Sequence, residues 1–421
     1  MIRLLTRAVT RERVRRFAVA ILVVNALLYV LVVARGRFPY DAEGTLILPD
    51  FLAHLTAGAM VLGGHTSALY DPDAQAAFQL GITGDSKIVD LFLSPPHVAL
   101  FYAPFALLSY ASGVVVWTLL SLSLLVGSGR LLTALTPSLK EDDRRLFFLA
   151  FAASEPVIEL LGSGQDTAIS LLLWAAGTLL SLRRQDAAAG IVFALGLFKP
   201  QLFLFPPLVL FVLRRWRALG GWAAVAIAIG ALTLVVFGTA GIRGWWGILH
   251  SPQYLVALRS GRALLMASIV PFFLSIAPDS LSRVADAIGR AVAGLVLLAT
   301  LVRCRKGPGT LDERGVWALA SVAALLVTPH LFPYDLALLV LPAALLLEIS
   351  GAYRETVRGA LLALALLTWT SAVRAPFETA GWPIRMFAAS WTAIPMFVLW
   401  REIPTALSGA GERPATPPRS A

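Results

Sequence analysis

The sequence predicts an all-α, polytopic membrane protein with about twelve transmembrane helices. Of its 421 residues, 58% are hydrophobic and only 14% are charged, and the mean hydropathy is +0.77. Apolar runs of about 13 to 25 residues, many long enough to form a transmembrane helix, recur from one end of the chain to the other. A soluble chain of this length would carry about twice this fraction of charged residues. These observations exclude an ordinary soluble globule.

The first predicted helix follows a basic segment, residues 1–16. The apolar run from Phe17 to Val33 is long enough to cross a bilayer and has no convincing small-residue cleavage site. It is therefore interpreted as a membrane span rather than as a cleaved signal peptide. The arginines that precede it predict a cytoplasmic amino terminus.

The later helices were assigned to sides by the distribution of arginine and lysine, which favour the cytoplasmic side. One alternation gathers the basic clusters on that side, namely 140–145, 183–184, 214–217, 303–306 with Arg314, 354–358 and the tail from Arg401. It implies helices near 17–35, within 98–135, and near 146–161, 167–182, 187–198, 201–213, 223–239, 285–302, 315–329, 335–350, 358–373 and 385–400. Region 98–135 is too long for one helix, so a re-entrant or interfacial piece is expected before a single span.

The predicted organisation is one transmembrane domain, residues 17–400. Two large loops, 36–96 and 241–278, lie on the external side, and a cytoplasmic tail, 401–421, is expected to be disordered because it is rich in Pro, Gly and Arg. The formal charge of +10 follows from topology and does not indicate nucleic-acid binding. The single cysteine, Cys304, excludes an internal disulfide and a cysteine-based metal site.

This topology places the polar motifs together on the external side, although they are scattered over nearly the whole chain. They are Asp50 with His54, His97, Gln165 with Asp166, Lys199 with Gln201, Arg259 with Arg262, and His330 with Tyr334 and Asp335. Because the basic clusters alone determined the assignment, this convergence indicates one shared external cavity.

Asp50 is a candidate general base. If the stretch PDFLAHLTAG is helical, Asp50 and His54 lie one turn apart on one face, so the histidine could tune or orient the acid. The alternative is that Asp50 is an N-cap or first-turn acid, a position that aspartate favours. Asp41 and Glu43 in the same loop are rival acids.

Lys199 is a candidate ligand for an anion, because a lysine between two short apolar helices is costly near hydrocarbon unless it faces water or a negative partner. Phosphate is the natural anion, with Gln201 as a neighbouring donor. The other polar residues have structural alternatives: an interfacial role for His97, a cap for Asp166, and lipid head-group binding for Arg259 and Arg262. For His330, Tyr334 and Asp335 a functional role and a structural role are equally supported by the sequence.

Several enzyme classes have no support in the sequence. No HExxH, Walker A, GxSxG or strand-associated GxGxxG motif is present, nor an aspartate-rich DxD pair of the kind that holds a metal-bound nucleotide sugar. No metal and no separate cofactor are expected.

Five segments, in this order, resemble glycosyltransferase family 87, a C-type family that includes mycobacterial mannosyltransferases of phosphatidylinositol mannosides and lipoglycans. They are DFLAHLTAGAMVLGGHTSALYDPDAQ, FLSPPHVALFYAPFALLSY, GSGQDTAISLLL, AAGIVFALGLFKPQLFLFPPLVLFVLRRWRA and TPHLFPYDLALL. The resemblance extends over about residues 17–400, and the order of the segments is more specific than any one of them. His54 departs from the family pattern, in which a tyrosine is commoner after the acid that corresponds to Asp50.

The resemblance implies a membrane enzyme that takes a sugar, usually mannose, from a polyprenyl phosphate on the external leaflet of a bacterial inner membrane. The acceptor would be a hydroxyl of a glycolipid or glycan. It further implies that Asp50 is the general base of an inverting displacement, and Lys199 would then stabilise the phosphate leaving group.

Two other functions remain open from the sequence. A lipid-linked-sugar flippase or secondary transporter would use the same polar groups along a transport path, but such proteins usually have internal repeats and ionisable groups near the midplane. A noncatalytic assembly partner is the other alternative, and it would be favoured if Asp50 were dispensable.

Overall fold

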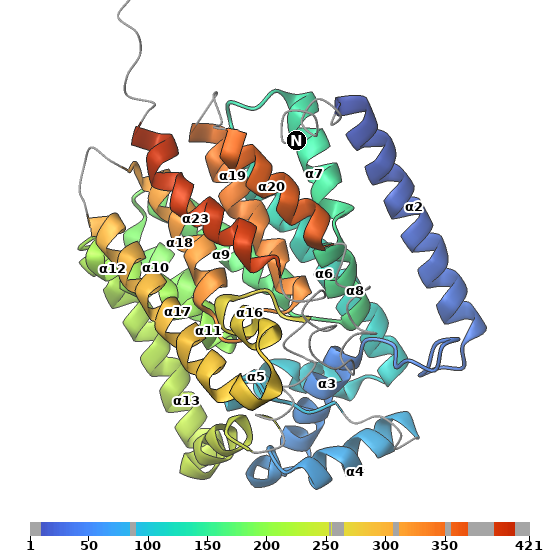
Figure 1. Cartoon of the computed structure of the whole chain (residues 1–421). Helices are drawn as coiled ribbons and strands as arrows, with labels where there is room; N and C mark the ends of the chain where they lie inside the picture. Colours follow the sequence, from blue (N-terminus) through green and yellow to red (C-terminus); the bar gives the residue numbers. More distant parts are fainter. Residues whose placement is uncertain are drawn as a thin grey trace, which may run out of the picture.

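A computed structural model of the chain describes residues 10–84, 90–251, 254, 265–305, 311–349, 355–368 and 391–408. Within these residues the regular structure is helical, and the β pairing is confined to isolated bridges near Tyr40. The predicted all-α class is therefore confirmed. Figure 1 shows the helices gathered into one bundle, with α2 along one side.

The helices, with 3-10 helices labelled η, have the following bounds. They are α2 Arg11–Arg35, α3 Pro49–Leu62, η1 Thr66–Ala68, α4 Pro72–Thr83, α5 Pro96–Tyr102, η2 Ala103–Leu107, α6 Tyr110–Leu135, α7 Glu141–Ala152, α8 Glu155–Ser163, α9 Thr167–Leu182, α10 Asp186–Leu195, η3 Gly196–Phe198, α11 Pro200–Phe203, α12 Phe205–Val212, α13 Trp216–Leu249, α16 Ile269–Ile276, η4 Asp279–Leu281, α17 Ser282–Arg305, α18 Glu313–Val327, η5 Pro333–Leu339, α19 Val340–Ile349, α20 Glu355–Thr368 and α23 Ala393–Ser408.

The predicted number of membrane spans is not supported. Among the described residues, four helical stretches are long and apolar enough to cross a bilayer: Arg11–Arg35, Tyr110–Leu135, Trp216–Leu249 and Asp279–Arg305. A fifth is possible if α7 and α8, which are bent by 49° at their junction, act as one span. The chain is thus a helical membrane protein, but with fewer long spans than the expected twelve.

The physical reason for the difference is helix length. Most predicted segments do form helices, and α9 has the predicted bounds, but many are short. At 1.5 Å per residue, a helix of about 10 to 17 residues extends ~15 to 25 Å, less than the hydrocarbon core of about 30 Å. Hydropathy alone does not separate such buried helices from complete spans. Region 98–135 matches its prediction, because α5 and η2 form a short helical piece before the single long helix α6.

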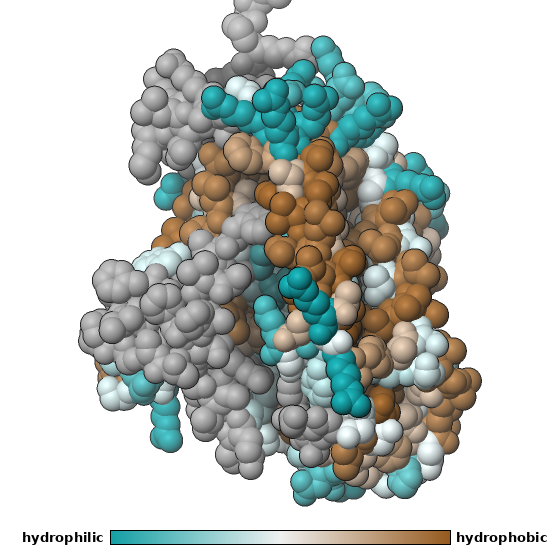
Figure 2. All heavy atoms as spheres, turned by 90° about the vertical axis from the view of Figure 1, so that its right-hand side faces the viewer, coloured by the Kyte–Doolittle hydropathy of each residue, from teal (hydrophilic) through white to brown (hydrophobic). Residues whose placement is uncertain are grey.

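The ends of the described chain lie on one side of the bundle. Figure 1 shows the start of α2 and the end of α23 at the top, with α3 and α4 at the bottom. Figure 2 shows hydrophilic residues gathered at the same top end, above a broad hydrophobic band. This arrangement agrees with a membrane orientation in which both termini share a side, while the identity of that side stays a prediction.

Three of the basic clusters meet in ion pairs and hydrogen bonds. The Arg215 guanidinium lies 2.8 Å from Asp186 and 2.7 Å from Glu313, and Arg184 lies 3.2 Å from the same glutamate. Arg314 donates a hydrogen bond of 2.7 Å to the Leu135 carbonyl. The end of α6 and the starts of α10, α13 and α18 therefore lie together, as the charge pattern predicted.

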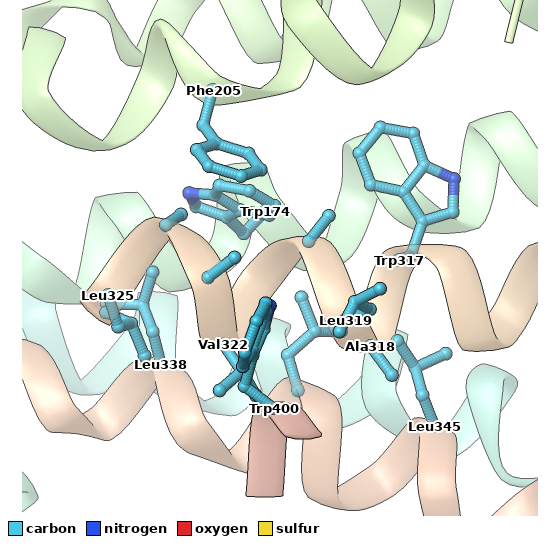
Figure 3. Packing of buried hydrophobic residues seen from close by; sticks show 14 of the residues in the cluster. Trp174, Phe205, Trp317, Ala318, Leu319, Val322, Leu325, Leu338, Leu345 and Trp400 are labelled. Atoms are coloured by element: carbon cyan, nitrogen blue, oxygen red, sulfur yellow. The ribbon is translucent and has the colours of Figure 1, made fainter. Parts of the chain in front are cut away.

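The main hydrophobic core surrounds α18. Every residue from Gly315 to Leu326 is buried, so this helix is enclosed on all sides. Figure 3 shows Trp174 and Phe205 on one side of α18 and Trp400 of α23 on the other. Trp317 stacks on Phe193 with ring centroids 4.9 Å apart. A continuously apolar helix such as α18 is stable only when its neighbours cover its whole circumference.

Two buried glutamines organise the first large loop. The Gln75 side chain donates to the Leu69 carbonyl at 2.8 Å and accepts from the Phe92 amide at 2.7 Å. Gln79, one turn later on α4, donates to and accepts from the backbone of Asp90. Because buried backbone groups need partners, these amides fix the segment 90–92 against α4.

The turn between α8 and α9 packs tightly against the start of α3. Gly164 has a φ of +77°, and a Cβ at this position would lie only 2.9 Å from the Cβ atoms of Leu48 and Phe51. Trp117 fixes the turn from the other side, because its indole N–H donates to the Gly164 carbonyl at 2.8 Å. Glycine is therefore required here both by backbone conformation and by space.

We expect Gly164→Ala to lower the melting temperature of the purified protein in detergent. The substitution combines a strained φ with a steric overlap, and its cost should exceed about 1 kcal/mol. Gly162→Ala is the matched control, because a Cβ at residue 162 meets no atom within 4 Å. Equal melting temperatures for the two variants would contradict the tight packing of this turn.

Candidate active site

Asp50 lies in the first turn of α3, two residues after a strained residue. Leu48, which precedes the helix, is buried and has left-handed torsions of φ 55° and ψ 60°. The Tyr110 hydroxyl donates hydrogen bonds to the carbonyls of Ile47 and Leu48. An unfavourable conformation of this kind persists only when neighbouring contacts enforce it, and such strain is common at functional sites. These contacts fix the direction in which α3 leaves the loop.

The Asp50 carboxyl is only partly exposed and has no arginine or lysine partner among the described residues. Burial raises its pKa from 3.8 to about 6, and the negative charge of Asp90 contributes in the same direction. The neighbouring Gln165, His54 and Ser163 side chains partly oppose this rise. A carboxylate with a pKa near 6 is a stronger proton acceptor than an ordinary surface aspartate and is still mostly ionised at neutral pH.

The rival acids have different surroundings. Asp41 Oδ1 accepts hydrogen bonds from the amides of Glu43 and Thr45, both at 2.9 Å, so this carboxylate stabilises a local turn. Glu43 is exposed. Of these three candidate acids, Asp50 is the one that lies in a helix.

His54 is buried one turn after Asp50, but its ring does not bond to the Asp50 carboxyl. Its Nδ1 lies 2.7 Å from the Asp50 backbone carbonyl, and its Nε2 lies 3.2 Å from the Ser94 hydroxyl. Since a carbonyl only accepts, Nδ1 is the donor of the first of these contacts. The Tyr102 ring packs against the imidazole at 4.5 Å. His54 thus connects α3 to the segment before α5.

Lys199 lies in a buried cluster with two aspartates. Its ammonium nitrogen is 2.9 Å from Asp166 Oδ1, 2.8 Å from Asp335 Oδ1 and 3.0 Å from Thr167 Oγ1. The Thr167 hydroxyl in turn donates to Asp335 at 2.7 Å. The ammonium also lies 5.3 Å from the centre of the Tyr334 ring. The residues of this cluster come from the start of α9, the junction of η3 with α11, and η5.

The turn between α8 and α9 joins this cluster to Asp50. Gln165 is one of the groups that act on the pKa of the Asp50 carboxyl, and Asp166, the next residue, pairs with Lys199. Tyr334 lies within electrostatic range of Asp50, Asp166 and Asp335. The structure therefore brings together five predicted site residues, Asp50, Gln165, Lys199, Tyr334 and Asp335, from four separate parts of the sequence.

The other predicted site residues are not part of this group. Gln201 is exposed on α11, and His97 is half-buried on α5. His330 faces Tyr254, with ring centres 5.8 Å apart, and burial lowers its pKa to about 4. Arg259 and Arg262 lie outside the described residues.

Sequence reasoning missed the contributions of Thr167, Tyr102 and Tyr110. Tyr102 is fully buried beside His54, and its hydroxyl has no hydrogen-bond partner within the described part of the chain. The charges of Asp166 and Asp50 both act on this phenol. No local signal marks these residues, because each acquires its role from contacts with distant segments.

The family model of glycosyltransferase family 87 matches residues 92–333, more than half of the chain. The chain belongs to glycosyltransferase family 87. The resemblance seen in the sequence motifs is thereby confirmed, and the protein is a glycosyltransferase. The matched segment includes Gln165, Asp166 and Lys199, whereas Asp50 precedes it. No curated protein and no solved structure matches the chain.

The described part of this family 87 protein contains no group of three or more His, Cys, Asp or Glu residues arranged to hold a metal ion. The independence of the enzyme from metals stays a prediction. Cys304 is buried on α17.

We expect Asp50→Asn to keep or raise thermal stability while changing its dependence on pH. Because the folded-state pKa of Asp50 lies above the ordinary value, the stability that this group contributes is present below about pH 4 and is lost as the pH rises through about 6. The asparagine variant has no such loss. Melting temperatures of both proteins should therefore diverge between about pH 4.5 and 7.5, with the variant higher at the upper end. A variant that is less stable at neutral pH would show that the Asp50 charge is stabilised in the fold.

Proposed function

We propose that this glycosyltransferase transfers a sugar, with mannose as the expected one, from a polyprenyl phosphate to a hydroxyl group of a glycolipid or glycan acceptor. Membership of family 87 supports the transferase class. The observation that carries the assignment of the base is the partly buried Asp50 carboxyl with its pKa near 6. A lipid-borne donor suits a helical membrane protein, and the charge pattern supports a site on the external side of a bacterial inner membrane.

The proposed reaction is a single displacement at the anomeric carbon. Asp50 takes the proton of the acceptor hydroxyl, and the acceptor oxygen forms a bond to that carbon. The bond from the carbon to the phosphate oxygen breaks on the opposite face, and its electron pair leaves with the polyprenyl phosphate. A β-linked donor thus gives an α-glycoside. No cofactor is consumed, because the phosphate ester supplies the leaving group.

The surroundings of Asp50 suit this role. Desolvation makes the carboxylate a better proton acceptor, while the neighbouring Gln165 side chain partly opposes the rise of its pKa. His54 holds the backbone carbonyl of the same residue, and Tyr110 holds the two carbonyls before the helix. The base is therefore fixed by several independent contacts, as proton transfer in a defined geometry requires.

The proposal does not assign the donor phosphate to Lys199. Its ammonium has three donors, and the structure places three acceptors, Asp166, Asp335 and Thr167, within 3.0 Å of it. With both aspartates ionised, the cluster carries a net negative charge. A phosphate would have to displace one of these partners, so its binding by Lys199 stays a prediction from the sequence.

We expect Asp50→Asn to reduce transfer of radiolabelled mannose from polyprenyl phosphate mannose by about 10²- to 10⁴-fold, the usual contribution of a general base. Asp41→Asn is the matched control, since it changes an acid of the same loop whose carboxylate bonds to the backbone. Equal loss in both variants would place the effect in the fold of the loop. Retained transfer in Asp50→Asn would remove the base role, and loss confined to Asp41→Asn would move that role to Asp41.

The pH dependence provides a second test. Because the reaction needs the ionised form of Asp50, kcat/KM should fall about tenfold per pH unit below pH ~6 and level off above it. The measurement is initial-rate transfer in detergent or vesicles between about pH 5 and 8, with stability checked at each pH. An activity that rises on acidification would indicate that the essential group acts in its protonated form.

A further inference from the structure

The turn 163–166 is attached to two different parts of the site. On one side, Gly164 fits between Leu48 and Phe51, the residues that flank Pro49 and Asp50. This packing brings the Gln165 side chain close to Asp50, where it lowers the pKa of the carboxyl. On the other side, Asp166 forms an ion pair with Lys199. The position of Gln165 thus depends on both attachments.

The second attachment is a closed and deeply buried network. The exposed fractions of the Lys199, Asp166 and Asp335 side chains are only 9%, 3% and 4%. Thr167 links the lysine to Asp335 by a second route, because it accepts from the ammonium and donates to the carboxylate. Buried charges of this kind are costly to separate, so each member constrains the others.

We propose that Lys199 is a positioning residue, which with Asp166, Thr167 and Asp335 holds the turn 163–166 against the start of α3 and so keeps the Gln165 amide beside the Asp50 carboxylate. This inference rests on the proposed role of Asp50 as the base. It gives the lysine a function in the reaction without contact with the sugar or the phosphate.

The effect of Lys199 on Asp50 must pass through the turn. The groups that act directly on the Asp50 carboxyl are Asp90 from the segment before α5, His54 on α3, and Gln165 and Ser163 from the turn. The phenols of Tyr102 on α5 and Tyr334 on η5 face it as well. Lys199 is not one of these groups. If the network is removed, Gln165 loses its position, the ionised form of Asp50 loses a donor, and the pKa of Asp50 rises.

The test compares three variants of the full-length protein. Gln165→Leu removes the donor itself. The triple variant Asp166→Asn, Lys199→Met, Asp335→Asn removes the network without adding negative charge. Glu313→Gln is the matched control, because it breaks a partly buried ion-pair network with Arg184 and Arg215 at the other end of α9. Two readouts are measured: the acidic limb of the kcat/KM profile, and the infrared titration of the Asp50 carboxyl, isolated by subtraction of the Asp50→Asn spectrum.

The expected result is an upward shift of both midpoints by about one pH unit in Gln165→Leu and in the triple variant, and no shift in Glu313→Gln. Unchanged midpoints together with a raised KM in the triple variant would overturn the proposal and would favour phosphate binding by Lys199. If the triple variant does not fold, Thr167→Val and Lys199→Arg replace it. A partial shift of the midpoints in the same direction supports the proposal, and the absence of any shift overturns it. The infrared titration needs no turnover. If the parent protein transfers no mannose, the proposed function fails, but a shifted infrared midpoint in the variants would still support the positioning role of Lys199.

Discussion

The buried ammonium of Lys199 constrains the arrangement of the whole site. A charge in this low-dielectric interior requires partners, and the chain supplies two carboxylates and a hydroxyl from residues 166, 167 and 335. The start of α9, the junction after η3 and the helix η5 must therefore meet at one point. The same turn that provides Asp166 also provides Gln165 and Gly164, which contact the start of α3. The position of Asp50 thus follows from an ionic contact that it does not itself make.

Much of the fold could be predicted from the sequence, because hydropathy and charge are local properties. The bounds of α9, the short helices around Lys199 and the meeting of Arg184, Arg215 and Arg314 at one end of the bundle all followed from them. The number of spans did not follow. The continuously apolar α18 has the composition of a membrane span, yet it is enclosed by other helices of the protein. Whether an apolar helix faces lipid or protein depends on its neighbours, which hydropathy does not identify.

The candidate site was predicted in outline and missed in detail. Asp50, Gln165, Lys199, Tyr334 and Asp335 do come together, as expected from their common side in the predicted topology. The argument that a buried lysine needs an anion was sound, but the structure supplies that anion from Asp166 and Asp335, residues 33 and 136 positions away in the chain. Such pairings cannot be deduced from local patterns, since they depend on how distant helices pack. His97 and Gln201 have suitable chemistry in the sequence but lie outside the group that the structure forms.

The carboxylates near this turn differ in chemical character because their partners differ. Asp166 and Asp335 share the ammonium ion of Lys199, at 2.9 and 2.8 Å. Asp50 has no such cation among the described residues, is partly desolvated and lies near the negative charge of Asp90, so its pKa is raised to about 6. Neutral donors such as the Gln165 amide oppose this rise without removing it. A lysine beside Asp50 would make it a weaker base. Lys199 instead pairs with Asp166, the residue after Gln165 in the turn, so the cation organises the site and leaves Asp50 able to accept a proton.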